Sequence, residues 1–112
     1  MSFVVPETEL EELADVLDSG KLELLRDRYE TARRIKQPLE MYTSRIWLFP
    51  FGVHPSSRHP VQVFRNGLAQ WMNHEVKLVK VGSRRPLTVA VFQRETRPGD
   101  RVQATYIAVE SP

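Results

Sequence analysis

The stretch IWLFPFGVHPSSRHPVQVF, residues 46–64, carries the strongest structural signal in the chain. It packs four large rings, two histidines and three prolines into a short span. Residues 46–49 are apolar at every position, which is typical of a strand buried on both faces, here by a sheet and by a helix. The prolines forbid regular pairing across the segment between the strands. We therefore expect two core strands, at 44–49 and 61–65, joined by a stiff exposed loop.

Length and composition indicate an ordinary globular domain. The chain has 112 residues, of which 41% are hydrophobic and 27% are charged, so we predict a single domain, residues 1–112, with its own core. No apolar run approaches the ~20 residues that span a bilayer, and the acidic N-terminus lacks the basic region of a signal peptide. The absence of cysteine excludes disulfides, thiolate metal sites and cysteine nucleophiles. We expect a cytoplasmic protein without a cofactor and without a membrane partner.

Charge is distributed unevenly along the chain. Residues 1–40 hold ten acidic and six basic side chains, a net charge of −4, and residues 41–112 hold ten basic and four acidic ones, a net charge of +6. We therefore distinguish an acidic helical arm, residues 1–38, from a basic β-rich part, residues 41–112. This asymmetry fits either a polyanion-facing part beside a partner-facing part, or two solvated faces that attract each other.

Helical periodicity is found in the acidic arm. Thr8 and Glu11 have the spacing of a capping box, and Gly20 is a typical helix stop. A second helical pattern runs from residue 22 until Pro38 ends it, so we predict a helical hairpin, with one bent helix as the alternative. Its apolar stripe is expected to bury against the sheet or against a second copy of the chain, which makes these the candidate partner-binding residues: Leu10, Leu13, Leu17, Leu22, Leu25 and Tyr29.

From residue 41 the periodicity is that of strands. Residues 87–92 alternate, with Leu87, Val89 and Val91 on one face, and residues 97–100 have Pro and Gly in type II turn positions. Asn66 is expected to cap a brief helix, and the last two strands are expected to form a hairpin. The predicted fold is α+β, an N-terminal helical hairpin followed by a mostly antiparallel sheet of about five strands, or a small curled sheet or barrel. The predicted strands are 44–49, 61–65, 76–81, 87–95 and 101–109.

Basic side chains cluster near the turns of the predicted sheet. Rings that stack on bases, together with Lys and Arg side chains that contact phosphates, are typical of nucleic-acid surfaces. Most rings are expected in the core, and the two exceptions are Phe51, in a loop, and Tyr106, on the last strand. If the last three strands form a meander, the candidate nucleic-acid-binding residues gather at its two ends: Lys80, Arg84 and Arg85 at one, and Lys77, Arg94, Arg97 and Arg101 at the other.

The loop between the first two strands holds His54 and His59, with Arg58 beside them. Two imidazoles near a cation fit acid–base cleavage of a phosphodiester, but spacing alone favours an exposed loop, and no third ligand completes a metal site. The sequence thus favours a non-enzymatic nucleic-acid-binding or regulatory protein with no catalytic residues. The alternatives are a protein-interaction or assembly module that docks through the acidic helices, and a small phosphodiester-cleaving enzyme.

Overall fold

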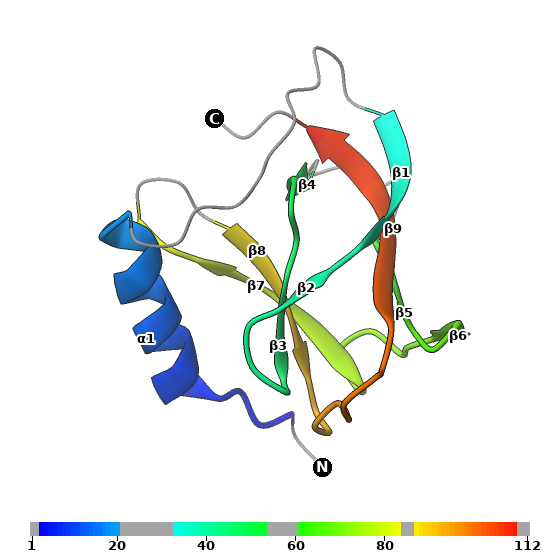
Figure 1. The fold of residues 1–112 in the computed structure, drawn as a ribbon, viewed down its shortest axis with the longest axis horizontal. Helices are drawn as coiled ribbons and strands as arrows, with labels where there is room; N and C mark the ends of the chain where they lie inside the picture. The colour runs from blue at the N-terminus through cyan, green and yellow to red at the C-terminus, as the bar shows by residue number, and fades with distance from the viewer. Residues whose placement is uncertain (1–2, 21–32, 54–60, 84–86, 110–112) are drawn as a thin grey trace.

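A computed structural model describes residues 3–20, 33–53, 61–83 and 87–109, without the side chains of residues 33, 34 and 109. Within these ranges the chain forms one helix and two antiparallel sheets in three layers (Figure 1). The helix lies on the sheet of order β2-β3-β8-β7, here called the inner sheet, and the outer sheet of order β1-β9-β5-β6, with β4 also paired to β9, lies beyond it. This arrangement confirms the α+β class, with two sheets rather than a closed barrel. The elements are α1 (Glu7–Asp18), β1 (Arg33–Pro38), β2 (Glu40–Met41), β3 (Ile46–Leu48), β4 (Gly52–Val53), β5 (Gln62–Arg65), β6 (Leu68–Ala69), β7 (Val76–Val81), β8 (Leu87–Phe92) and β9 (Val102–Val109).

Helix α1 begins one residue before Thr8, so the predicted capping box is wrong. No side chain caps the helix, and the Pro6 carbonyl accepts the first helical bond from the Leu10 N–H at 3.0 Å. Thr8 therefore lies inside the first turn, where its hydroxyl is not placed to cap. At the other end Gly20 has a φ of +73°, a left-handed conformation that glycine adopts at low cost, and this confirms the predicted helix stop.

The apolar face of α1 packs on the inner sheet of the same chain. Leu13 is fully buried, and Leu10 and Leu17 pack around it. The opposite face of the helix carries only charged and polar side chains at its exposed positions, as amphipathic helices do. Two loops of the inner sheet hydrogen-bond to the ends of the helix. Between β2 and β3, Thr43 Oγ1 donates to Glu9 Oε2 at 3.1 Å. Between β7 and β8, the Ser83 N–H donates to Asp18 Oδ1 at 3.1 Å.

Strand β3 is buried on both faces, as its sequence predicts. Ile46 and Leu48 join the core beneath α1, and Trp47 joins the core between the two sheets. Strand β8 behaves in the same way, with Leu87, Val89 and Val91 on the helix side and with Ala90 and Phe92 between the sheets. The inner sheet therefore has a covered surface on each side, which explains why its central strands contain almost no polar residues.

The core between the sheets contains both rings that were expected to be available, so that expectation is wrong for Phe51 and for Tyr106. Tyr106 is fully buried and meets Phe49 edge to face, with ring centroids 5.0 Å apart and an interplanar angle of 74°. The small residues Ala104 and Ala108 flank Tyr106 on the same face of β9 and leave room for these rings. Phe51 is buried as well, close to the point where the chain passes from the inner to the outer sheet.

Two corners join the sheets. The chain leaves β1 in the outer sheet and enters β2 in the inner sheet across Leu39, which is buried and donates its N–H to the Val102 carbonyl at 3.0 Å. It returns from β3 to β4 through Pro50 and Phe51, both of which are buried. Strands that change sheets at a bend are typical of orthogonally packed sheets. These corners enclose the core between the two layers.

The predicted helical hairpin is wrong where its second helix was expected to end, at residues 33–38. Residues 33–38 form β1, which pairs with β9 in antiparallel register from Arg33 opposite Ala108 to Pro38 opposite Gln103. Residues 21–32, the rest of the predicted second helix, lie outside the described ranges. β1 lies at the edge of the outer sheet, where Lys, Arg and Pro are common because they discourage further strand pairing.

The predicted hairpin between the last two strands is also wrong. Both edges of β8 are occupied, one by β3 and the other by β7. Residues 93–101 therefore carry the chain across to β9 in the other sheet, and Thr96 anchors this connection by donating its N–H and its Oγ1 to the Ser44 carbonyl at 2.8 and 2.7 Å. The predicted Arg-Pro-Gly-Asp turn is confirmed, since the Asp100 N–H donates to the Arg97 carbonyl at 3.0 Å and Gly99 has a φ of +89°.

We expect Trp47→Phe to change the free energy of unfolding by less than about 1 kcal/mol, although Trp47→Ala should cost about 3–5 kcal/mol. The reason is that the Trp47 indole N–H is buried without a hydrogen-bond partner among the described residues, and such a group costs about 1–3 kcal/mol. Removing that donor offsets the loss of ring atoms. Urea unfolding of the two variants checks this, and equal losses of stability in both would contradict it.

Candidate functional site

A tight hairpin joins β5 and β6 at the edge of the outer sheet. Asn66 and Gly67 connect the strands as a two-residue turn, with left-handed φ values of +53° and +81°. Positive φ at both positions is what a type I′ turn requires, and Asn-Gly is the commonest sequence for it. The brief helix predicted after Asn66 is therefore wrong, and the Asn-Gly dipeptide is the signal that was missed.

The hairpin tip is clasped to the connection between β8 and β9, residues 93–101, which we call the arginine loop. The Asn66 N–H donates to the Arg101 carbonyl at 2.8 Å, and the Arg101 N–H donates back to Asn66 Oδ1 at 2.9 Å. Asn66 Nδ2 also donates to Asp100 Oδ1 at 2.9 Å. Three hydrogen bonds at one turn residue fix the orientation of the hairpin against the arginine loop.

Asp100 is the centre of this clasp. Its Oδ2 receives the Arg97 N–H at 2.8 Å and lies 2.7 Å from Arg65 Nη2, and Arg65 Nε also donates to it at 3.0 Å. Arg65 Nη2 further donates to the Glu95 carbonyl at 3.1 Å. The backbone N–H of Arg97, then the Asn66 amide and Arg65, lower the pKa of Asp100 from 3.8 to about 2, because each of them favours the ionised carboxylate.

This lowered pKa predicts a pH dependence. Because the folded pKa of Asp100 lies below its ordinary value, the carboxylate adds stability above the ordinary pKa, and this contribution is lost as the pH falls through the folded pKa of about 2. We expect Asp100→Asn to melt at a lower temperature than wild type at neutral pH, with the difference disappearing in strong acid. Thermal unfolding of both proteins across this range checks it, and a difference that stays constant with pH would contradict it.

Two large apolar side chains are exposed beside this clasped turn. Leu68, at the start of β6, is 71% exposed, and Trp71, two residues after β6 ends, is 74% exposed. Ala69 between them is exposed as well. We call Leu68, Ala69 and Trp71 the hairpin surface. The backbone beneath it is fixed, since the Gln70 N–H donates to the Val63 carbonyl at 2.8 Å and the Trp71 N–H donates to Glu75 Oε1 at 3.2 Å.

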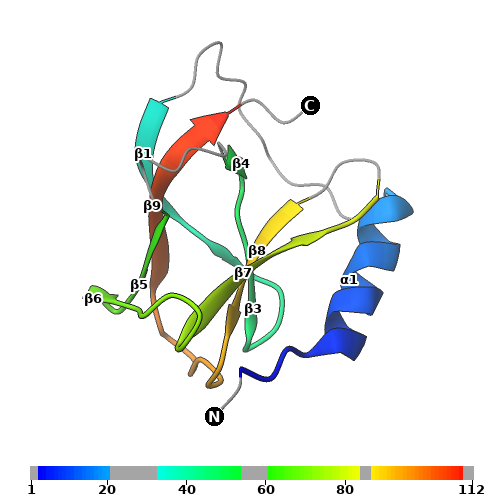
Figure 2. The same cartoon turned by 180° about the vertical axis from the view of Figure 1, so that it is seen from behind.

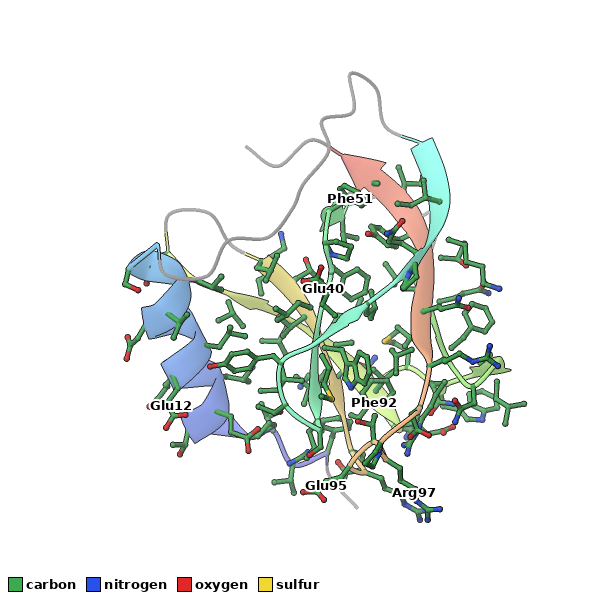
Figure 3. All side chains as sticks on the ribbon, in the orientation of Figure 1. Glu12, Glu40, Phe51, Phe92, Glu95 and Arg97 are labelled. Carbon is green, nitrogen blue, oxygen red and sulfur yellow. The ribbon has the colours of Figure 1, made fainter. Side chains whose placement is uncertain are left out.

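The candidate basic residues do not form one surface. Arg94, Arg97 and Arg101 are exposed together on the arginine loop, and Figure 3 shows Arg97 extending from the lower end of the molecule. Lys77 and Lys80 are exposed on β7, three residues apart on a strand, so they point to opposite faces. Arg84 and Arg85 lie outside the described ranges.

The candidate partner-binding leucines and the two loop histidines lie partly outside the described ranges. Leu10, Leu13 and Leu17 lie in the core beneath α1, whereas Leu22, Leu25 and Tyr29 fall outside the described ranges. His54 and His59 also fall outside them. Within the part of the chain that the structure describes, no group of three or more His, Cys, Asp or Glu side chains could hold a metal ion, and no helix is long and apolar enough to cross a membrane.

Comparison with protein-family models, with curated proteins and with solved structures finds no match to this chain. The sequence prediction of a brief helix after Asn66 puts Leu68, Trp71 and Met72 on one apolar helix face, and for this reason it missed the exposure of Leu68 and Trp71.

Proposed function

We propose that this protein is a protein-interaction or assembly module and that its contact surface is the hairpin surface. The observation that carries this proposal is the exposure of Leu68 and Trp71, each above 70%, at one edge of the outer sheet. Scattered apolar residues on a surface need no explanation, and Val4 and Met41 are exposed in that way. Leu68 and Trp71 differ because they are three residues apart in one short segment whose backbone hydrogen bonds hold it in place.

The energetics favour an apolar contact over a charged one at this edge. A buried aromatic side chain removes roughly 150–250 Å² from water, which at ~25 cal/mol per Å² sets an upper limit of about 4–6 kcal/mol for Trp71 before the costs of association are subtracted. An exposed ion pair contributes only about 0–1 kcal/mol. Tryptophan is accordingly enriched among the residues that dominate binding energies at protein interfaces. Trp71 is therefore the expected anchor, and the neighbouring arginines add orientation rather than most of the affinity.

Rigidity supports the same proposal. Binding a partner costs less when the contact surface is ordered beforehand. The three hydrogen bonds of Asn66 and the Arg65–Asp100 ion pair fix the hairpin in the unbound protein. A clasp of this kind beside two exposed apolar side chains is what a preorganised docking element requires.

Photo-crosslinking tests this function. A photoreactive benzoylphenylalanine replaces Trp71 in one variant and Lys80 in a matched control, since Lys80 is also exposed but lies at the edge of the inner sheet. We expect crosslinks to protein from position 71 and not from position 80 when the variants are irradiated in the cells that make them. The absence of any protein crosslink at position 71, or equal crosslinking at both positions, would contradict the proposal.

Nucleic-acid binding is the second candidate, favoured by the three exposed arginines of the arginine loop. The backbone just before Arg94 is tied to the segment that carries Trp71, since the Gln93 N–H donates to the Glu75 carbonyl and the Glu75 N–H donates to the Trp71 carbonyl. If phosphates bind here, Arg97→Ala/Arg101→Ala should lower the log–log salt slope of oligonucleotide binding by about 0.7–0.9 for each phosphate that the variant no longer binds. Titration of single- and double-stranded oligonucleotides at two salt concentrations tests this, and no binding by wild type at low salt removes the candidate.

A further inference from the structure

We propose that the partner of the hairpin surface is the acidic face of α1 on a second copy of this chain. This inference rests on the function proposed above and names its occupant. The contact joins two different surfaces of the same molecule, and three observations lead to it: the charge around the hairpin surface, the charge on α1, and the positions of the two surfaces on the fold.

The hairpin surface has cations beside it. Arg101 is exposed and its backbone forms two of the hydrogen bonds that clasp Asn66, so it lies next to the turn that precedes Leu68. Arg97 is exposed on the same loop. Arg65 is already paired with Asp100, which leaves the exposed arginines of the arginine loop, Arg94, Arg97 and Arg101, as cations available to a partner. A partner surface complementary to the hairpin surface and its arginines would combine carboxylates with some apolar area.

The exposed face of α1 has the complementary character. Its 12 residues contain six acidic side chains and no basic one. Five of the six are exposed, Glu7, Glu11, Glu12, Asp15 and Asp18, and Figure 3 shows Glu12 on the side away from the sheets. The helix ends with Asp15 and Asp18 and has no basic residue in its last turn, although the C-terminal end of a helix favours cations. Arginines from a second copy would supply the missing positive charge.

Apolar area accompanies these carboxylates. Val16 lies on the same helix and is only partly buried, and Val4, just before the helix, is 63% exposed. Neither contributes to the fully buried core beneath α1. Val16 is four residues from Glu12 and therefore borders the acidic face, where it offers apolar area to Leu68 and Trp71, so the contact does not rest on charge alone.

The positions of the two surfaces determine the kind of assembly. Helix α1 and strand β6 lie at opposite sides of the molecule, as both Figure 1 and Figure 2 show, with the two sheets between them. One chain therefore cannot bring its own hairpin surface to its own helix. When the two halves of a contact lie on different surfaces, each copy can bind one neighbour at each side, which produces rings or open chains rather than a two-fold dimer.

Mass measurements on purified protein test this inference. Light scattering should show wild type growing beyond two chains as its concentration rises, less so at high salt because charge pairs are screened. Trp71→Ala disables the hairpin surface, and Glu11→Lys/Asp15→Lys disables the helix surface. Each variant alone should associate roughly 10–100-fold more weakly than wild type, as expected for the loss of a dominant contact residue. Lys77→Glu/Lys80→Glu, a matched charge reversal on β7, should associate like wild type.

Mixing the two disabled variants gives the sharpest result. Each still has one intact surface, so the mixture should form particles of two chains and nothing larger. A helix variant that pairs with itself as well as wild type does would overturn the inference in favour of a hairpin-to-hairpin dimer. Wild type that remains a monomer at all concentrations would also overturn it. If position 71 then still crosslinks to a different protein, the proposed function stands and only the identity of the partner is wrong.

Discussion

Leu13→Asp is expected to lower the free energy of unfolding by about 4 kcal/mol or more, the largest effect of any single change to α1. Truncating a buried leucine costs about 2–5 kcal/mol, and a buried carboxylate without a partner adds a desolvation cost. Leu13 is fully buried and is the central contact between α1 and the inner sheet. Because the total stability of a domain this size is about 5–15 kcal/mol, the variant should unfold at much lower urea concentration.

Glu12→Ala is the matched control for this prediction. Glu12 is the residue immediately before Leu13, and its side chain is exposed, so removing it should change stability by less than about 0.5 kcal/mol. Urea unfolding followed by circular dichroism measures both variants. A Leu13→Asp protein as stable as the control would show that α1 does not depend on this contact.

Phe49→Ala is expected to cost about 3–5 kcal/mol, the typical penalty for truncating a buried aromatic ring. Phe49 is fully buried between the sheets and packs edge to face on Tyr106. It also lies at the corner where the chain leaves the inner sheet, so the cavity would open between the two layers. Both sheets should loosen together, which denaturant unfolding monitored by amide hydrogen exchange can detect.

Met41→Ala provides the comparison for an apolar side chain of similar size. Met41 is 63% exposed on β2, so its truncation should cost less than about 0.5 kcal/mol. If exchange in Phe49→Ala accelerates in one sheet while the other keeps wild-type protection, the two layers do not share the core described above.

Patterns that depend on local burial could be predicted from the sequence. Residues 76–81 form a strand with the predicted bounds, and residues 87–92 alternate between two cores as predicted. The uniformly apolar run at 46–48 is covered on both faces. These predictions succeed because the side-chain period of a strand is fixed by its backbone geometry, whatever the strand pairs with.

Features that depend on pairing partners could not be predicted in this way. Residues 33–38 contain good helix formers, yet they form β1 because the edge of β9 is available to them, and tertiary contacts override a weak propensity. The prediction of a hairpin between β8 and β9 is wrong because β3 and β7 already pair with the two edges of β8. Tyr106 was expected as an available ring on the last strand, but the small residues Ala104 and Ala108 beside it allow its ring to pack inside.

The candidate site illustrates the same limit. Trp47 stands in a uniformly apolar run, which predicts its burial, whereas Trp71 stands between Gln70 and Met72 in a segment whose pattern predicts one apolar helix face. Trp47 is 8% exposed and Trp71 is 74% exposed, a difference that arises from the position of β6 at the edge of the outer sheet. Only the Asn-Gly turn at 66–67 was a local signal for that position, and it identifies the hairpin but not the exposure of the side chains that follow.

Trp71 is expected to be open to solvent in a single copy and to become covered when the protein binds its partner. Acrylamide quenching of fluorescence in the Trp47→Phe background tests it most directly, because Trp71 is then the only tryptophan. The quenching constant should be high in dilute protein and fall as the concentration is raised, and Glu11→Lys/Asp15→Lys should remove that fall. Strong protection already present in dilute protein, or quenching that never changes when a partner or a second copy binds, would contradict the account.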